Sequence, residues 1–108
     1  MNDFDQIIWS DAPILVEFFA LWCGSCQAMA PTIERFRHMM NGRAGVFRID
    51  IDDELMLPIV RRYGIRRVPT LLLFHRGREL WRRSGIASYE ELVAALEQAE
   101  ANTQVVQH

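Results

Sequence analysis

The period of the hydrophobic positions changes several times along the chain, and each change predicts a new element. Residues 14–20 (ILVEFFA) form an almost unbroken apolar run of strand-forming residues, typical of a central strand that is covered on both faces. Over residues 24–40 the apolar positions recur at helical spacing and predict a helix, in which Pro31 should cause a kink. Shorter patterns predict helices over residues 2–10 and 53–63 and strands over residues 46–51, 70–74 and 79–83.

Local signals mark the last part of the chain. Residues 75–78 (HRGR) have the composition of a hairpin turn, which would pair the strands on either side of it antiparallel. Residues 88–91 (SYEE) are a capping box that opens a final helix, and residues 101–108 are expected to form a flexible tail. Because helices separate the other strands, we expect right-handed parallel crossovers. The prediction is a single α/β domain over residues 1–108, with a central mixed sheet flanked by helices.

The overall composition is that of a folded domain and excludes several other classes of protein. The 108 residues are 50% hydrophobic and 24% charged, which allows one core without disulfide staples or metal. No apolar run approaches the roughly 20 residues of a membrane helix, so we expect no membrane partner. The N-terminal segment is acidic where a signal peptide would be basic, so we expect it to belong to the mature protein.

The charges are distributed unevenly along the chain. All 12 basic residues are arginines, and eight of them lie between Arg61 and Arg83, although the formal net charge is −2. A basic middle between acidic ends can mark a partner surface, but the acidic balance favours an ordinary solvated arginine face. We expect no nucleic-acid partner, because such binding usually needs a stronger net positive field.

The two cysteines of the chain, Cys23 and Cys26, stand where a predicted strand meets a predicted helix. Residues at i and i+3 in a first helical turn have Cα atoms about 5–6 Å apart, within the range of a disulfide. Cys23 lies at the helix N-terminus, where free N–H groups and the helix dipole stabilise a thiolate, so it is the predicted nucleophile. Cys26 lies on the buried side and should attack only the mixed disulfide that Cys23 forms.

Other interpretations of the cysteine pair stay open at this point. The pair could be half of a metal site, but the three histidines are scattered, so a second chain would have to complete the ligands. It could be a structural disulfide, although so short a loop adds little stability. The position between a strand and a helix favours redox chemistry, with no metal and no cofactor beyond the disulfide itself.

Several motifs together resemble the thioredoxin family over about residues 4–100: ILVEFFALWCGSC, VFRIDID, YGIRRVPTLLLF and Ser84-Gly85-Ile86. The resemblance implies the thioredoxin fold, dithiol–disulfide exchange on protein disulfides, and a separate flavoprotein reductase of the thioredoxin-reductase type as electron donor. It also implies that Pro69 is a cis-proline facing the cysteines, and that the backbone of Val68 pairs with an extended substrate segment. The apolar docking rim that it implies consists of Trp22, Val68, Pro69, Gly85 and Ile86.

Glu17 interrupts the apolar run of the first strand, six residues before Cys23. A buried, charged and unpaired carboxylate is costly, and the thioredoxin family is similar in carrying a buried acid here, usually aspartate. The resemblance implies that Glu17 accepts a proton from Cys26, with a pKa raised by burial. It also implies that Arg48 corresponds to a nearby lysine of the family and could hold Glu17 ionised. The alternative is that Glu17 reaches solvent at a sheet edge.

The chain departs from the family pattern at three places. Ser25 replaces the usual proline of the active-site dipeptide Gly24-Ser25, which bears on the redox potential. Arg67 replaces a small residue and adds charge beside the docking rim. The chain before Cys23 is too short for the family's first strand, so we expect about four strands, with residues 46–51 at an open edge. Such an edge could pair with another chain, although the monomer should remain the main species; alternatively, residues 103–106 (TQVV) could cover it.

Together these patterns predict a cytoplasmic protein-disulfide reductase of the thioredoxin type, acting in electron transport and cell redox homeostasis. Two alternatives are a disulfide oxidant or isomerase outside the cytoplasm and a non-enzymatic scaffold that binds a partner through its arginine-rich middle. The reduction potential distinguishes the first two, since thioredoxin lies near about −270 mV and isomerases near about −180 mV. Turnover of a protein disulfide distinguishes both from the scaffold.

Overall fold

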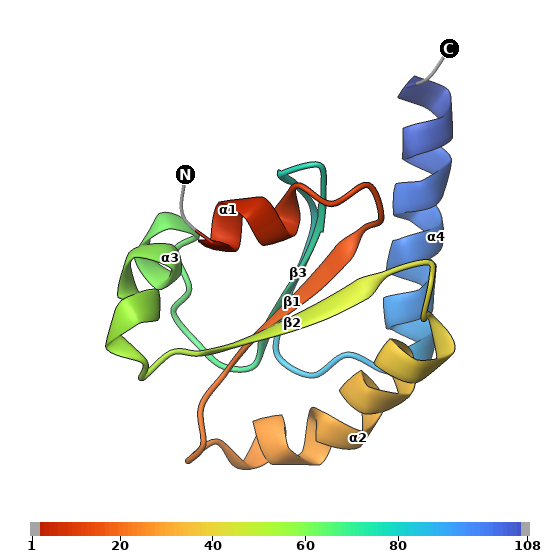
Figure 1. The fold of residues 1–108 in the computed structure, drawn as a ribbon. Helices are drawn as coiled ribbons and strands as arrows, with labels where there is room; N and C mark the ends of the chain where they lie inside the picture. Colours follow the sequence, from red (N-terminus) through yellow and green to blue (C-terminus); the bar gives the residue numbers. More distant parts are fainter. Residues whose placement is uncertain (1–2, 107–108) are drawn as a thin grey trace.

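The computed structural model describes residues 3–106, with side chains described for residues 3–102. Figure 1 shows a central sheet with α1 and α3 on one side and α2 and α4 on the other. The elements in chain order are α1 (Asp3–Ile8), β1 (Ile14–Phe19), α2 (Gly24–Met39), β2 (Gly45–Asp50), η1 (Glu54–Met56), α3 (Leu57–Arg62), β3 (Thr70–His75), β4 (Arg78–Ser84) and α4 (Tyr89–Val106).

The described residues form a four-stranded sheet in the order β2-β1-β3-β4. β1 pairs parallel with β2 and antiparallel with β3, and β3 pairs antiparallel with β4. The β3–β4 hairpin turns at Arg76 and Gly77, which have φ of 50° and 82°, as a two-residue type I′ turn requires. The mixed sheet flanked by helices is therefore confirmed, and β2 lies at its edge.

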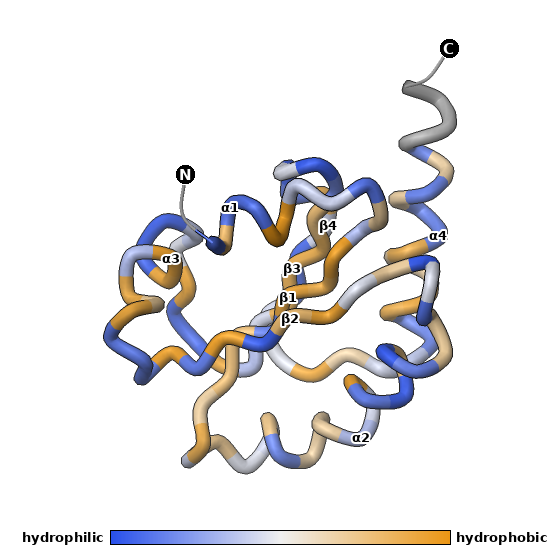
Figure 2. Tube along the Cα trace, in the orientation of Figure 1, coloured by the Kyte–Doolittle hydropathy of each residue, from blue (hydrophilic) through white to orange (hydrophobic). Residues whose placement is uncertain are grey.

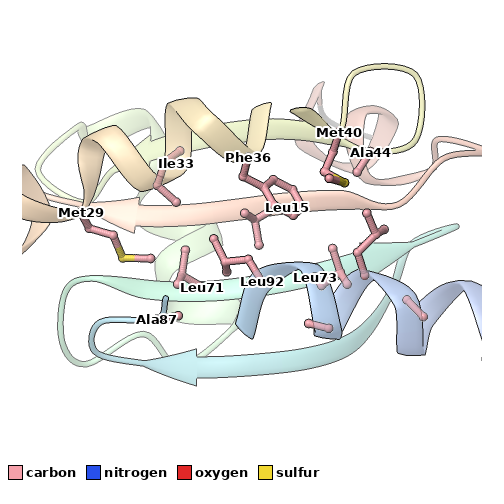
Figure 3. Close-up of a cluster of buried hydrophobic side chains, with 13 residues drawn as sticks. Leu15, Met29, Ile33, Phe36, Met40, Ala44, Leu71, Leu73, Ala87 and Leu92 are labelled. Atoms are coloured by element: carbon pink, nitrogen blue, oxygen red, sulfur yellow. The ribbon is translucent and has the colours of Figure 1, made fainter. Parts of the chain in front are cut away.

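β1 and β3 are buried on both faces, which explains their continuous apolar sequences. Figure 2 shows hydrophobic residues concentrated on these central strands. On one face, Leu15, Leu71 and Leu73 pack against residues of α2 and α4 such as Ile33, Phe36 and Leu92 (Figure 3). The opposite face packs against α1 and α3 through Phe4, Ile8, Val16, Phe18, Ile59, Leu72 and Phe74. The two clusters fix the register of the strands that carry the site.

The helical segment over residues 53–63 differs from the prediction. The single helix expected over residues 53–63 is a 3-10 turn, η1, followed by α3, because Pro58 stands in the first turn of the new helix.

The capping box is confirmed, since the Glu91 N–H donates to Ser88 Oγ at 3.1 Å and the Ser88 N–H to Glu91 Oε1 at 2.9 Å.

The last helix extends further than predicted. It continues to Val106, through most of the segment 101–108 that was expected to form a tail; residues 107–108 lie outside the described residues. Residues 103–106 are helical, which excludes the alternative that they cover the edge of β2 as a strand and agrees with the predicted open edge.

Candidate active site

Cys23 and Cys26 form a disulfide at the N-terminus of α2, with their Cα atoms 5.2 Å apart. Cys23 is the N-cap residue, and its sulfur accepts a hydrogen bond from the Cys26 backbone N–H at 3.1 Å. This donor and the helix dipole favour negative charge on the Cys23 sulfur once the disulfide is reduced. The strand that ends at Phe19 and the helix that begins at Gly24 therefore present the first cysteine as the activated one.

The surroundings of the two sulfurs differ. The Cys23 sulfur lies 3.4 Å from the Ser25 hydroxyl and 3.8 Å from the Val68 carbonyl oxygen. Cys23 is 5% exposed and Cys26 only 1% exposed, so Cys26 is the more enclosed of the pair.

The loop before β3 passes directly beside the disulfide. The Val68–Pro69 peptide bond is cis, as the family resemblance implied. The Pro69 carbonyl accepts a hydrogen bond from the Gly85 N–H at 2.7 Å, and Gly85 has a φ of 100°, which L side chains rarely adopt. This bond holds Gly85, the residue after β4, against the cis-proline loop.

The residues of the predicted docking rim differ in exposure. Trp22 and Ile86 are exposed, at 69% and 57%, whereas Val68 is half-buried and Pro69 is buried. The Trp22 indole N–H donates to Asp52 at 2.8 Å, which fixes the ring beside the active-site turn. Sequence analysis missed Asp52, which lies 30 residues away in the β2–η1 loop and carries no local signal. It also missed Leu21, which is 74% exposed next to Trp22.

Glu17 is fully buried in β1, which excludes the solvent-facing alternative. Its Oε1 accepts a hydrogen bond from Arg48 Nε at 2.6 Å, and Arg48 is its cross-strand neighbour on β2. The other oxygen, Oε2, has no hydrogen-bond partner among the described residues. Burial raises the pKa of Glu17 above its ordinary value, and the hydrogen bond and charge of Arg48 offset only part of this effect.

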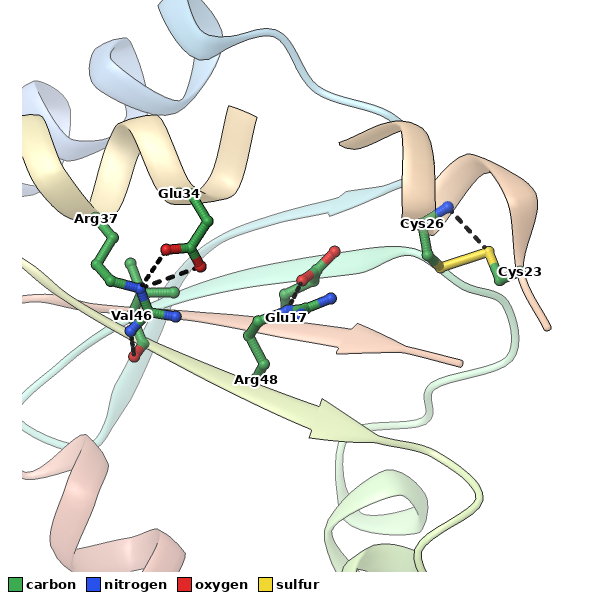
Figure 4. Close-up of polar contacts among 7 residues, drawn as sticks. All are labelled: Glu17, Cys23, Cys26, Glu34, Arg37, Val46 and Arg48. Atoms are coloured by element: carbon green, nitrogen blue, oxygen red, sulfur yellow. Dashed lines mark hydrogen bonds and ion pairs between the residues drawn. A yellow bond between two sulfur atoms is a disulfide. The ribbon is translucent and has the colours of Figure 1, made fainter. Parts of the chain in front are cut away.

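A cavity of about 220 Å³ lies between Cys26 and Arg48. It has room for several water molecules, since each occupies about 30 Å³ in the liquid. Figure 4 shows the Glu17–Arg48 pair on the side of the sheet covered by α2, where the disulfide also lies. The cavity thus extends from Cys26 to Arg48, the arginine that pairs with the buried Glu17. The remaining residues that line it are Phe19, Ala20, Leu21, Gln27 and Ala30.

The described residues offer neither a metal cluster nor a membrane span. Within them, no group of three or more His, Cys, Asp or Glu side chains is placed to hold a metal ion. No helix in the same part of the chain is long and apolar enough to cross a bilayer.

Comparison with known proteins identifies the family. A family model described as Thioredoxin matches residues 1–98. The chain belongs to the thioredoxin family. The thioredoxin of Alicyclobacillus acidocaldarius is 36% identical over 94 residues, which cover 87% of this chain and 88% of that protein. The thioredoxin of Pseudomonas aeruginosa is 34% identical over 95 residues, which cover 87% and 86%.

A solved structure supports the thioredoxin fold independently. The structure titled "Structure of a malarial protein" superposes with a TM-score of 0.74 at 22% identity, covering 81% of this chain and 96% of that one. At this identity the likeness concerns the fold alone. Family membership and the joined Cys23–Cys26 pair together indicate a thiol–disulfide oxidoreductase.

Proposed function

We propose that this thioredoxin-family protein reduces protein disulfides. The Cys23 thiolate attacks one sulfur of a substrate disulfide, forming a mixed disulfide and releasing the other substrate sulfur as a thiolate. Cys26 then attacks the Cys23 sulfur, which restores the Cys23–Cys26 disulfide and releases the second substrate thiolate. Two electrons pass to the substrate, whose thiolates take up two protons. A separate flavoprotein of the thioredoxin-reductase type would return the electrons.

The observation that carries this proposal is the hydrogen bond from the Cys26 N–H to the Cys23 sulfur at the start of α2. It stabilises a thiolate at Cys23 and offers nothing comparable to Cys26, so the two thiols have different roles. The exposed apolar side chains of Trp22 and Ile86 provide a surface on which a protein substrate can dock.

Glu17 serves as the proton acceptor for Cys26 in this proposal. As an ionised carboxylate, it takes the Cys26 proton, which water in the cavity between Cys26 and Arg48 can carry towards the Arg48–Glu17 pair. Arg48 orients the carboxylate through Oε1 and leaves Oε2 free to receive the proton. Gly24 and Ser25 complete the turn and set the surroundings of the Cys23 sulfur.

Ser25 supports a second candidate, a disulfide oxidant or isomerase. Its hydroxyl lies 3.4 Å from the Cys23 sulfur and can donate to the thiolate, which would stabilise the reduced form and raise the reduction potential. We favour a cytoplasmic reductant, which works where thiols are kept reduced. A potential near about −270 mV would support the reductant, and one near about −180 mV the alternative.

Two single-cysteine variants test the proposed function with a disulfide-bonded protein as substrate. Cys23→Ser should abolish reduction, because the attacking thiolate is lost. Cys26→Ser should still attack once and accumulate a covalent mixed disulfide, visible by non-reducing electrophoresis and mass spectrometry. Reduction by Cys23→Ser at the wild-type rate, or no reduction by the wild-type protein, would contradict the proposal.

A further inference from the structure

Two arginines on the rim of the disulfide have no ion-pair partner in the part of the chain whose side chains are described. Arg66 and Arg67 are both exposed and stand immediately before the cis Val68–Pro69 bond. Other arginines of the same basic segment are neutralised: Arg62 pairs with Asp5 at 2.6 Å, Arg82 with Glu79 at 2.8 Å and Arg83 with Glu91 at 2.5 Å. Arg66 and Arg67 therefore leave positive charge unpaired in the loop beside the redox site, whereas the other arginines of the segment without an ion pair among the described side chains, Arg61 and Arg78, lie in α3 and at the start of β4.

The backbone of Arg67 is held in a defined place. Its carbonyl accepts a hydrogen bond from Thr70 Oγ1 at 2.7 Å, and the carbonyl of the next residue, Val68, lies 3.8 Å from the Cys23 sulfur. Neighbouring Cα atoms are about 3.8 Å apart, so the long Arg67 side chain starts one peptide unit from Val68, the residue whose carbonyl faces the Cys23 sulfur. Its guanidinium can reach a group carried by a substrate that is bound to Cys23.

A second loop near the active-site turn is acidic. Asp52 and Asp53 are exposed on the β2–η1 loop, and the Trp22 indole N–H, next to Cys23 in the chain, donates to Asp52. An acidic group of a partner would be repelled by this loop and attracted by Arg66 and Arg67. The position of an acidic group on the partner therefore matters as well as its charge.

We propose that the Arg66–Arg67 pair selects protein disulfides that carry an Asp or Glu within a few residues of the attacked cysteine, on the Val68 side. A free guanidinium presents paired N–H donors that match a carboxylate, and no existing ion pair has to be broken. The apolar rim then supplies general docking, and the two arginines add the preference among substrates. This inference rests on the proposed function.

The test uses disulfide-bridged peptides that differ only in one residue, Glu, Gln or Lys, placed either before or after the attacked cysteine. The kcat/KM of their reduction by the wild-type protein should be about two- to fivefold higher for Glu than for Gln, and lowest for Lys, at one of the two placements. The preference should shrink as salt is added. It should fall to about one in Arg67→Gln with Arg66→Gln and reverse in Arg67→Glu.

Arg78→Gln is the matched control. Arg78 is exposed and has no ion-pair partner among the described side chains, but it lies at the opposite end of β4, beside the hairpin turn. This variant should keep the wild-type preference for Glu. Equal reduction of all peptides by the wild-type protein, or a preference that survives the loss of both rim arginines, would overturn the inference alone. If no peptide is reduced, the proposed function itself fails, and this inference with it.

Discussion

The Arg48 guanidinium donates a 2.6 Å hydrogen bond to Oε1 of Glu17, a carboxyl that is fully buried in the sheet, and leaves Oε2 without a partner among the described residues. A buried ion pair of this kind is weak evidence for stability, because the cost of desolvation can exceed the attraction between the charges. The pairing instead keeps a carboxyl able to ionise close to the redox disulfide. This geometry agrees with the proton-transfer role that we propose for the pair.

Replacing Glu17 with Gln should slow the resolving step. The amide is close in size to the carboxyl but cannot accept the Cys26 proton, so the mixed disulfide with substrate should persist longer. Single-turnover kinetics measure its lifetime directly. Glu90→Gln, a change of the same kind at an exposed position of α4, should leave it unchanged. An unaltered lifetime in Glu17→Gln would remove Glu17 from the mechanism.

Glu17 also predicts how stability depends on pH. Because the pKa of Glu17 is raised by burial above its ordinary value of 4.5, the folded protein holds this proton more tightly than the unfolded chain. Its contribution to stability is fully present below 4.5 and is lost as the pH rises through the folded-state pKa. The free energy of unfolding, measured by denaturant titration, should therefore increase in Glu17→Gln relative to the wild type as the pH rises through this window. A difference that does not change with pH would contradict the assignment.

Ser25 should tune the redox potential through its hydroxyl. Ser25→Ala removes a group 3.4 Å from the Cys23 sulfur that can donate to the thiolate, so the reduced form should be less favoured. A hydrogen bond to a charged group contributes about 1.5 kcal/mol, which for this two-electron couple is about 30 mV. We expect the potential, measured against a glutathione or dithiothreitol couple, to fall by this order. An equal or higher potential in Ser25→Ala would show that the hydroxyl does not stabilise the thiolate.

Hydrogen exchange along β2 should alternate from residue to residue. The Gly45 N–H donates to the carbonyl of Pro13, just before β1, and the Ile51 N–H to the carbonyl of Phe19 in β1. In the ladder between them, every second residue of β2 points its N–H group in this same direction. Residues of the other parity face the open edge, where the Arg37 side chain donates to the Val46 carbonyl at 3.2 Å (Figure 4). In a dilute monomeric sample, the amides of Val46 and Arg48 should therefore exchange fast, and those of Phe47 and Ile49 should exchange slowly. Uniform protection would mean that something covers the edge.

Much of the fold could be predicted from local patterns. The runs of β1 and β3 are apolar at every position but one or two because both faces are covered, and the capping box at Ser88 marks the start of α4 directly. The boundary of α4 could not be predicted in the same way. Its last turns lack a glycine or proline stop, so the polar composition alone suggested a tail.

The site could be predicted in its residue types but not in its connections. The spacing of Cys23 and Cys26 and the interruption at Glu17 are visible in the sequence. The hydrogen bond from Trp22 to Asp52, the cavity beside Cys26 and the Arg37 contact to the edge strand join residues that are distant in the chain or belong to separate elements. Such contacts depend on how the elements pack, which no local pattern specifies.

The central claim is that the N-terminus of α2 activates Cys23 and not Cys26. The most direct test is competitive alkylation of the fully reduced protein with a limiting reagent at a series of pH values, with each cysteine quantified by mass spectrometry. The account predicts that Cys23 is modified faster at neutral pH and that its rate reaches its plateau at a pH below the ordinary thiol pKa of about 8.5. Faster modification of Cys26, or a Cys23 rate that still rises at that pH, would contradict it.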